Sequence, residues 1–237
     1  MVKCDWASDV CPSELRPAVP RQLTGFAGRA GATRAGRATV ALVVIGAAAT
    51  LASGAANSLG TFLVDSAAGR GLSPGLAGLT LTLGSAVCVA ARVGAGWLAD
   101  RRETGHVALI AAMLLVGAVG LGLLALTGSV PLVVGVVLGF GLGWAWPGLM
   151  NFAVVRLHPQ SPAAATSITQ TGVYAGGCLG PLSLGPLAAH LGYSAMWTIA
   201  AVAMLLAAAL MLVGSRLLTR AATAAGRGVD QLVRSAM

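Results

Sequence analysis

Long stretches without charge constrain this chain more than any other feature. Residues 107–155 contain no Asp, Glu, Lys or Arg, and residues 71–99 contain only Arg92. Charged residues make up 9% of the chain and hydrophobic residues 57%, whereas a soluble domain of this length has roughly a quarter charged residues. About 20 apolar residues cross a bilayer as a helix, and a helix satisfies its own backbone hydrogen bonds in lipid. The chain is therefore predicted to be an all-α polytopic membrane protein.

Six apolar segments of spanning length are separated by short segments rich in turn residues. We predict transmembrane helices at residues 40–64, 76–98, 107–126, 132–155, 163–190 and 195–214. The chain then divides into a cytoplasmic tail or linker (residues 1–39), a six-span domain (residues 40–218) and a basic cytoplasmic tail (residues 219–237).

The first fifteen residues of the amino-terminal tail are interpreted separately from the rest of the chain. Residues 4–15 resemble the translated read-through of a common sequencing adapter, and on that interpretation the chain is a truncated gene product. The alternative is an ordinary amino-terminal tail. In either case we assign no function to these residues.

The distribution of Lys and Arg predicts the orientation in the membrane. Both tails are basic, and Arg101, Arg102 and Arg156 lie in loops on the same side as the tails. The opposite side has only Arg70. Because cytoplasmic loops carry the excess of basic residues, both termini are predicted to be cytoplasmic and the protein to lie in the cytoplasmic (inner) membrane. The net charge of +8 is explained in this way, without a nucleic-acid partner.

Polar side chains differ between the spans in an ordered way. The first, second, fourth and fifth spans carry them, and the third and sixth are almost purely apolar. This order predicts a 3+3 inverted repeat, in which four spans line a cavity and two face lipid. The candidate cavity residues are Asn57, Arg92, Trp144, Asn151, Gln170 and Tyr174. For each one, hydrogen bonding between helices is the alternative. Trp97 and Trp197 are predicted to anchor helices at the membrane interface.

A short charged turn between the second and third spans identifies a family. Gly96, Leu98, Ala99, Asp100 and Arg101 match the start of the loop signature G-x-L-A-D-R-x-G-R-R, and the later positions of the signature differ. The fifth span carries glycines and a proline in a related pattern, at Gly176, Gly180, Pro181 and Gly185. In these motifs the chain resembles the major facilitator superfamily (MFS) of secondary transporters.

The resemblance implies a function and an incomplete carrier. A complete family member has twelve spans in two halves, and the weaker loop signature is typical of the second half, so the chain resembles the carboxyl-terminal half. Its partners would be the lipid bilayer, a small solute, a possible coupling ion, and the missing amino-terminal half or a second copy. The resemblance also implies that Asp100 forms a latch with a helix end in the opposite half.

Glycine and proline residues are interpreted as structural. Rows of glycine four residues apart, at Gly135, Gly139 and Gly143 and again at Gly172, Gly176 and Gly180, predict close helix packing. Pro147 is predicted to kink the fourth span, and Pro181 and Pro186 the fifth.

Arg92 is the single charged residue well inside a span. One hypothesis makes it the contact for an anion or a substrate carboxylate. The other makes it a structural residue that reaches the cytoplasmic surface or joins a network with Asp100, about 12 Å away along the helix. A charge at this depth costs about 2.5–3.5 kcal/mol on insertion scales, so a cavity or a partner is expected.

Other function classes find little support. No nucleophile motif of an intramembrane protease, no P-loop and no metal-ligand spacing is present, so we predict neither an enzyme nor a metal or cofactor site. The predicted function is a secondary active transporter. The alternatives are a non-transporting six-span assembly protein and a half-size carrier that acts as a homodimer.

Overall fold

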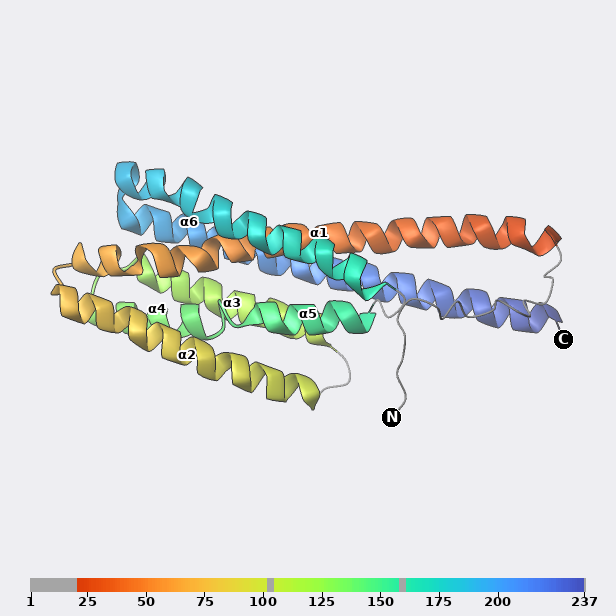
Figure 1. The fold of residues 1–237 in the computed structure, drawn as a ribbon, viewed down its shortest axis with the longest axis horizontal. Coiled ribbons are helices and arrows are strands. Elements are labelled where there is room, and N and C mark those ends of the chain that lie inside the picture. The colour runs from red at the N-terminus through yellow and green to blue at the C-terminus, as the bar shows by residue number, and fades with distance from the viewer. Residues whose placement is uncertain (1–20, 102–104, 158–160, 237) are drawn as a thin grey trace, which may run out of the picture. The chain divides into compact units, whose positions relative to one another are not determined.

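The computed structural model describes the backbone of residues 21–101, 105–157 and 161–236, and the side chains of residues 39–101, 105–157 and 161–217. The predictions for residues 1–15 and for Arg102 fall outside the described residues. The chain divides into two units, residues 1–36 and 37–237, and all contacts discussed below lie within the second unit. Every element in the described part is a helix: α1 (Arg21–Ala68), α2 (Pro74–Asp100), α3 (His106–Leu124), α4 (Ser129–Gly141), α5 (Trp146–Leu157) and α6 (Pro162–Ala236) (Figure 1).

The helices confirm an all-α protein of membrane-spanning character. Five helical stretches in the described part are long and apolar enough to cross a bilayer: Thr39–Ala68, Pro74–Asp100, His106–Leu124, Ser129–Leu157 and Pro162–Leu217. The first four coincide with the first four predicted spans. The fifth contains both of the remaining predicted spans.

Helix α6 is divided by one residue. Gly192 has φ 83° and ψ 166°, which are not helical angles, and it lies in the segment predicted as a loop. A positive φ is strained for residues with a Cβ but readily adopted by glycine. At this position the chain reverses, and Figure 1 shows the two arms of α6, residues 162–191 and 193–236, meeting at one end of the bundle and diverging from there. The backbone stays helical through Pro181 and Pro186, so glycine rather than proline causes the break.

The fourth predicted span is two helices rather than one kinked helix. Helix α4 ends at Gly141, residues 142–145 form turns, and α5 begins at Trp146. Pro147 is the second residue of α5, where a missing N–H costs nothing because the first turn of a helix leaves these donors free. The glycines of this region favour the helix break, because glycine loses more conformational entropy than other residues when it becomes helical. The backbone carbonyls around the break are left without the partners that a continuous helix would supply.

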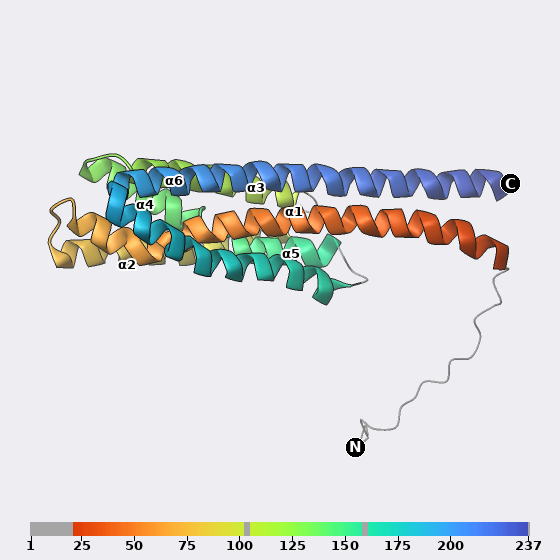
Figure 2. The ribbon, with the colours of Figure 1, turned by 90° about the horizontal axis from the view of Figure 1, so that it is seen from above.

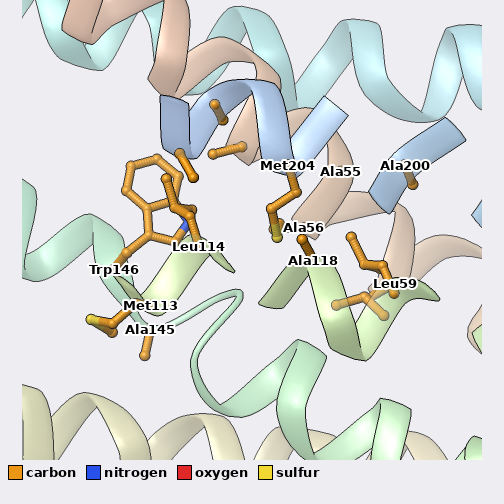
Figure 3. Close-up of a cluster of buried hydrophobic side chains, with 14 of the residues drawn as sticks. Ala55, Ala56, Leu59, Met113, Leu114, Ala118, Ala145, Trp146, Ala200 and Met204 are labelled. Carbon is orange, nitrogen blue, oxygen red and sulfur yellow. The ribbon is translucent and has the colours of Figure 1, made fainter. Parts of the chain in front are cut away.

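The core forms where α1, α3, α5 and the second arm of α6 meet. Leu59 of α1, Leu114 of α3, Trp146 of α5 and Met204 of α6 are fully buried. Figure 3 shows these side chains with small alanines between them. The alanines let the helices approach, and the large side chains fill the space that remains.

Glycine rows bring α1 and α6 into backbone contact. A Cβ added at Gly176 or Gly180 would collide with the backbone of Thr50 or Gly54 of α1. Only glycine allows this approach, which gains van der Waals contact that lipid cannot supply. Gly185 follows on the same arm and faces the ring of Phe62. A second such contact joins Gly117 and Gly120 of α3 to Gly139 and Gly143.

The interpretation of Trp197 as an interface anchor was wrong. Its side chain is fully buried, and its Nε1 donates a hydrogen bond of 2.9 Å to Ser66 Oγ of α1. Helix α1 thus contacts both arms of α6, one through glycines and the other through this bond, and Figure 2 shows it between the two arms. Trp97, in contrast, is 58% exposed, as an interface anchor requires.

Candidate functional site

A cavity of about 530 Å³ lies between the carboxyl-terminal part of α2 and the start of α5. Its α2 wall consists of Arg92, Ala95, Gly96, Ala99 and Asp100. Its other wall consists of Ala145, Pro147, Gly148, Leu149, Asn151 and Phe152. The helix break therefore forms part of the cavity, because residues of the turn and of the first turns of α5 replace what would be a continuous helical surface. Small residues on both walls leave the space unfilled.

Arg92 joins the two walls. Its Nη2 donates a hydrogen bond of 3.3 Å to the backbone carbonyl of Trp144, within the turn that separates α4 from α5. The break exposes this carbonyl, and a guanidinium with five N–H groups is well suited to it. Arg92 shares a cavity with Asp100, and it also faces a space large enough for a solute.

Asn151 contributes an amide to the same cavity. Its Oδ1 is buried and has no hydrogen-bond partner. Trp146 on the same helix also has a buried Nε1 without a partner. Most buried polar atoms in proteins are paired, and unpaired ones point to strain or function. Two such atoms on one short helix single out α5 as the part of the bundle with unused hydrogen-bonding capacity.

The loop signature forms part of the α2 wall of this cavity. Gly96 and Asp100 line it and are exposed, Leu98 is half-buried, and Ala99 is buried. Gly96 has no atom near the position of an added Cβ, so no close packing within this chain explains the glycine. Arg101 stacks on the Trp97 ring, with 3.7 Å from Cζ to the ring centroid. Asp100 is thus the exposed acidic group of this end of α2.

His106 and Phe152 were not selected from the sequence. His106 contacts the loop signature at Ala99, and Phe152 packs against His106. His106 is 7% exposed, its Nε2 lies 3.4 Å from the Ala99 carbonyl, and its ring meets Phe152 edge-on at 5.3 Å. The guanidinium of Arg156 lies over the same Phe152 ring, with 4.8 Å from Cζ to the ring centroid. No spacing in the sequence indicates that His106 meets a residue of α5.

The other predicted cavity residues are not brought to this site. Asn57 Nδ2 donates to the Ser53 carbonyl at 2.8 Å and to Ser53 Oγ at 3.1 Å, and Ser53 Oγ in turn donates to the Val173 carbonyl of α6 at 2.7 Å. Trp144 contributes its carbonyl to the site, but its ring packs against Phe140 with centroids 5.2 Å apart. Gln170 is half-buried on α6, and Tyr174 on the same arm is 70% exposed. None of these four residues is among those that line the cavity of Arg92.

The opposite end of the bundle is closed by a cluster of hydrogen bonds that we call the carbonyl clamp. Arg70, in the turn between α1 and α2, donates from Nη1 to the Leu126 carbonyl at 2.9 Å and from Nη2 to the Leu124 carbonyl. Ser194, just beyond the α6 break, donates to the Ala125 carbonyl at 2.8 Å. Burial lowers the pKa of Arg70 from its ordinary value, yet arginine keeps its proton in proteins. Carbonyls that the end of α3 leaves free are thus bound by two elements remote in sequence.

Comparison with known proteins identifies the family. The chain matches the sequence model of the Major Facilitator Superfamily over residues 42–234. The match covers most of the chain, and the protein therefore belongs to the Major Facilitator Superfamily, whose members are membrane transporters. No curated protein matches the sequence significantly.

Proposed function

We propose that this chain is a six-pass unit of a secondary active transporter, which moves a small solute across the cytoplasmic membrane by alternating access. The family match supports transport. The reversal at Gly192 supports six crossings, because the stretch Pro162–Leu217 has 56 residues. A straight helix of that length would measure about 84 Å, far more than the roughly 30 Å of a bilayer core. Divided at Gly192, it yields two helices of spanning length.

The orientation follows from the charges at the two ends of the bundle. Arg101 and Arg156 lie at the carboxyl-terminal ends of α2 and α5, the helices that line the cavity, and Arg70 lies at the other end of the bundle, within the carbonyl clamp. The positive-inside rule makes the cavity end cytoplasmic. With an even number of crossings both termini are then cytoplasmic as well.

A second six-helix unit would complete the carrier. Only 11% of the α2 apolar window is buried within this chain, against 50% for α3. Helix α2 also carries Arg92, the charged residue well inside a predicted span, and Asp100. In a 3+3 arrangement this face borders the solute pathway, and the opposing unit is either an amino-terminal half or a second copy. We expect that this chain alone inserts into the membrane but does not catalyse uptake.

Cysteine accessibility tests the number of crossings directly. In a background with Cys4, Cys11, Cys88 and Cys178 replaced by alanine, single cysteines replace Thr127, Leu191 and Ser161, all exposed. An impermeant maleimide added to intact cells should label Thr127→Cys and Leu191→Cys, and should label Ser161→Cys only after the membrane is opened. A further single cysteine at Arg216, which is exposed on the second arm of α6 past the sixth predicted span, should also be labelled only after the membrane is opened. Labelling of Arg216→Cys in intact cells would contradict the reversal of α6 and reduce the protein to five crossings.

The homodimer is a distinct candidate, favoured by the exposed side chains on α2. Val93 is 70% exposed and Val89 64%. Val89→Cys in the same background, treated with a bifunctional maleimide in native membranes, should give a crosslinked dimer if two copies face each other. The lipid-facing control Leu205→Cys, which is 46% exposed on α6, should give none. Equal crosslinking at both positions would indicate random collision.

A further inference from the structure

The cavity between α2 and α5 combines both signs of charge within one small space. Arg92 and Asp100 lie on the α2 wall, two turns of helix apart, and Asn151 lies on the opposite wall. Each of these side chains lines the cavity, and the remaining lining residues are apolar or glycine. Such a space, with few polar groups on apolar walls, has the composition of a small-molecule site.

Arg92 and Asn151 suit a carboxylate. The guanidinium spends one N–H on the Trp144 carbonyl at 3.3 Å, and its planar fork has four further donors. That hydrogen bond holds the guanidinium against the turn, so a carboxylate would meet a positioned donor set. Asn151 lines the opposite wall, and the NH₂ group of its amide can supply another donor. Pairs of arginine with carboxylate are among the strongest hydrogen-bonded contacts in proteins.

Asp100 makes a simple anion a poor fit. Its carboxylate borders the same cavity, and a solute with only negative charge would be repelled there. The two residues lie eight positions apart on one helix, or about 12 Å along its axis. A solute that carries a carboxylate at one end and an ammonium group at the other meets an opposite charge at each end.

The size of the cavity sets an upper limit. About 530 Å³ accommodates a small organic molecule and excludes a macromolecule. Gly96 and Gly148 have no side chain to fill it, and an added Cβ at either position would meet open space. Phe152 and Leu149 offer an apolar surface for a short methylene chain.

From this arrangement we propose that the cavity binds a small zwitterionic solute of the amino-acid class, with its carboxylate on Arg92 and Asn151 and its ammonium group on Asp100. The proposal rests on the transport function proposed above, since it names the solute class of that carrier. It makes Arg92 a solute ligand that is oriented by the Trp144 carbonyl, and Asp100 a second ligand at the cytoplasmic mouth.

Thermal unfolding of the purified chain in detergent tests the proposal. The probes are γ-aminobutyrate, butyrate and butylammonium, which separate the zwitterion from its two charged halves. A ligand that binds only the folded state raises the unfolding temperature with its concentration. Unfolding is followed through half-buried Cys88 with a maleimide dye, in a background where Cys4, Cys11 and the exposed Cys178 are alanine. We expect γ-aminobutyrate to stabilise at concentrations at least about tenfold below those needed for either other probe.

Three variants assign the contacts. Arg92→Gln should abolish stabilisation by γ-aminobutyrate, and Asp100→Asn should remove its advantage over butyrate while leaving butyrate binding unchanged or stronger. Arg216→Gln, which removes one exposed positive charge on α6, should change neither response. Equal stabilisation by butyrate and γ-aminobutyrate in the unaltered chain, or an unchanged response in Asp100→Asn, would overturn the proposal. If no probe stabilises the chain while the cysteine labels show six crossings, the solute class is wrong and the carrier topology stands.

Discussion

The two ends of the bundle solve the problem of free helix carbonyls in opposite ways. At the carbonyl clamp, Arg70 and Ser194 bind three successive carbonyls at the end of α3, and three elements are joined. At the cavity end, the break between α4 and α5 exposes the Trp144 carbonyl, and one hydrogen bond of 3.3 Å from an exposed arginine meets it. At the carbonyl clamp, each of these three carbonyls has a side-chain donor. The other end keeps a cavity and polar atoms without partners.

This difference suggests where the molecule can change shape. The three hydrogen bonds of the carbonyl clamp join separate elements, so moving those elements apart costs the contribution of every bond. Groups that are poorly paired can exchange partners at little cost. A carrier that alternates between two states needs movement at a solute site, and we expect it at the cavity end, with the carbonyl clamp as a fixed base within this unit.

The largest effect is expected for Arg70→Ala. The substitution leaves the Leu124 and Leu126 carbonyls without their donors, and hydrogen bonds to a charged group contribute about 1.5–3 kcal/mol each. We expect a loss of about 3 kcal/mol in the free energy of unfolding, measured in mixed micelles by the reactivity of Cys88. Arg92→Ala is the matched control at the cavity end. An equal loss in both variants would remove the distinction between the two ends.

Trp197→Phe tests the same closed end through a neutral bond. Phenylalanine keeps most of the buried ring and removes the Nε1 donor to Ser66 Oγ. A neutral hydrogen bond contributes about 1 kcal/mol, and the buried hydroxyl left behind adds to the cost, so we expect a loss of about 1.5 kcal/mol in the same assay. Ser66→Ala should lose less, because it keeps the whole buried indole ring, whereas Trp197→Phe also leaves space where the indole ring was larger. Stability unchanged in Trp197→Phe would show that the hydrogen bond contributes nothing.

Arg92→Ala should affect stability little. Its one hydrogen bond is long, and the side chain is exposed, so we expect a loss under about 1 kcal/mol. The sharper readout is access to the cavity. In the cysteine-free background, a single cysteine at Gly148 should react faster with a maleimide when Arg92 is alanine, because the turn is no longer tied to α2. A slower reaction would contradict a tethering role.

Pro147→Ala should have the smallest effect. The substitution restores an N–H to the first turn of α5, where it has no helical acceptor as long as the turn at residues 142–145 persists. We expect a change within about 0.5 kcal/mol and unchanged labelling at Gly148. Gly143→Ala is the informative companion, because an added Cβ there would collide with the backbone of Gly139 and Gly117. If Pro147→Ala instead protects Gly148 from labelling, proline rather than glycine maintains the break.

The sequence predicted the course of the chain well, for a physical reason. Hydropathy depends on composition over about 20 residues, so the absence of charge from residues 107–155 was enough to place α3 and the α4–α5 span. Glycine spacing along one helix face likewise indicated which surfaces pack closely, and Gly176 and Gly180 do meet α1. The loop signature identified the family that the match over residues 42–234 shows.

The sequence predicted the residues of the candidate site less accurately than it predicted the helices. Arg92 and Asn151 share a cavity, whereas Gln170 and Tyr174 do not join them. All four were selected as polar residues inside apolar spans, which is a property of each helix alone. Which of them share a space depends on how the helices cross, and the local sequence carries little information about that.

The sequence by itself determined that this protein is a bundle of membrane-spanning helices and where those helices turn, because both depend on local polarity and on residues such as Gly192 that permit a reversal. Only the tertiary structure decided the rest. Trp197 became a core residue, Arg70 a clamp on α3, and Arg92 a link from α2 to the break in the fourth span. Each role rests on a hydrogen bond between residues more than 50 positions apart, and such a bond exists only once the helices have packed.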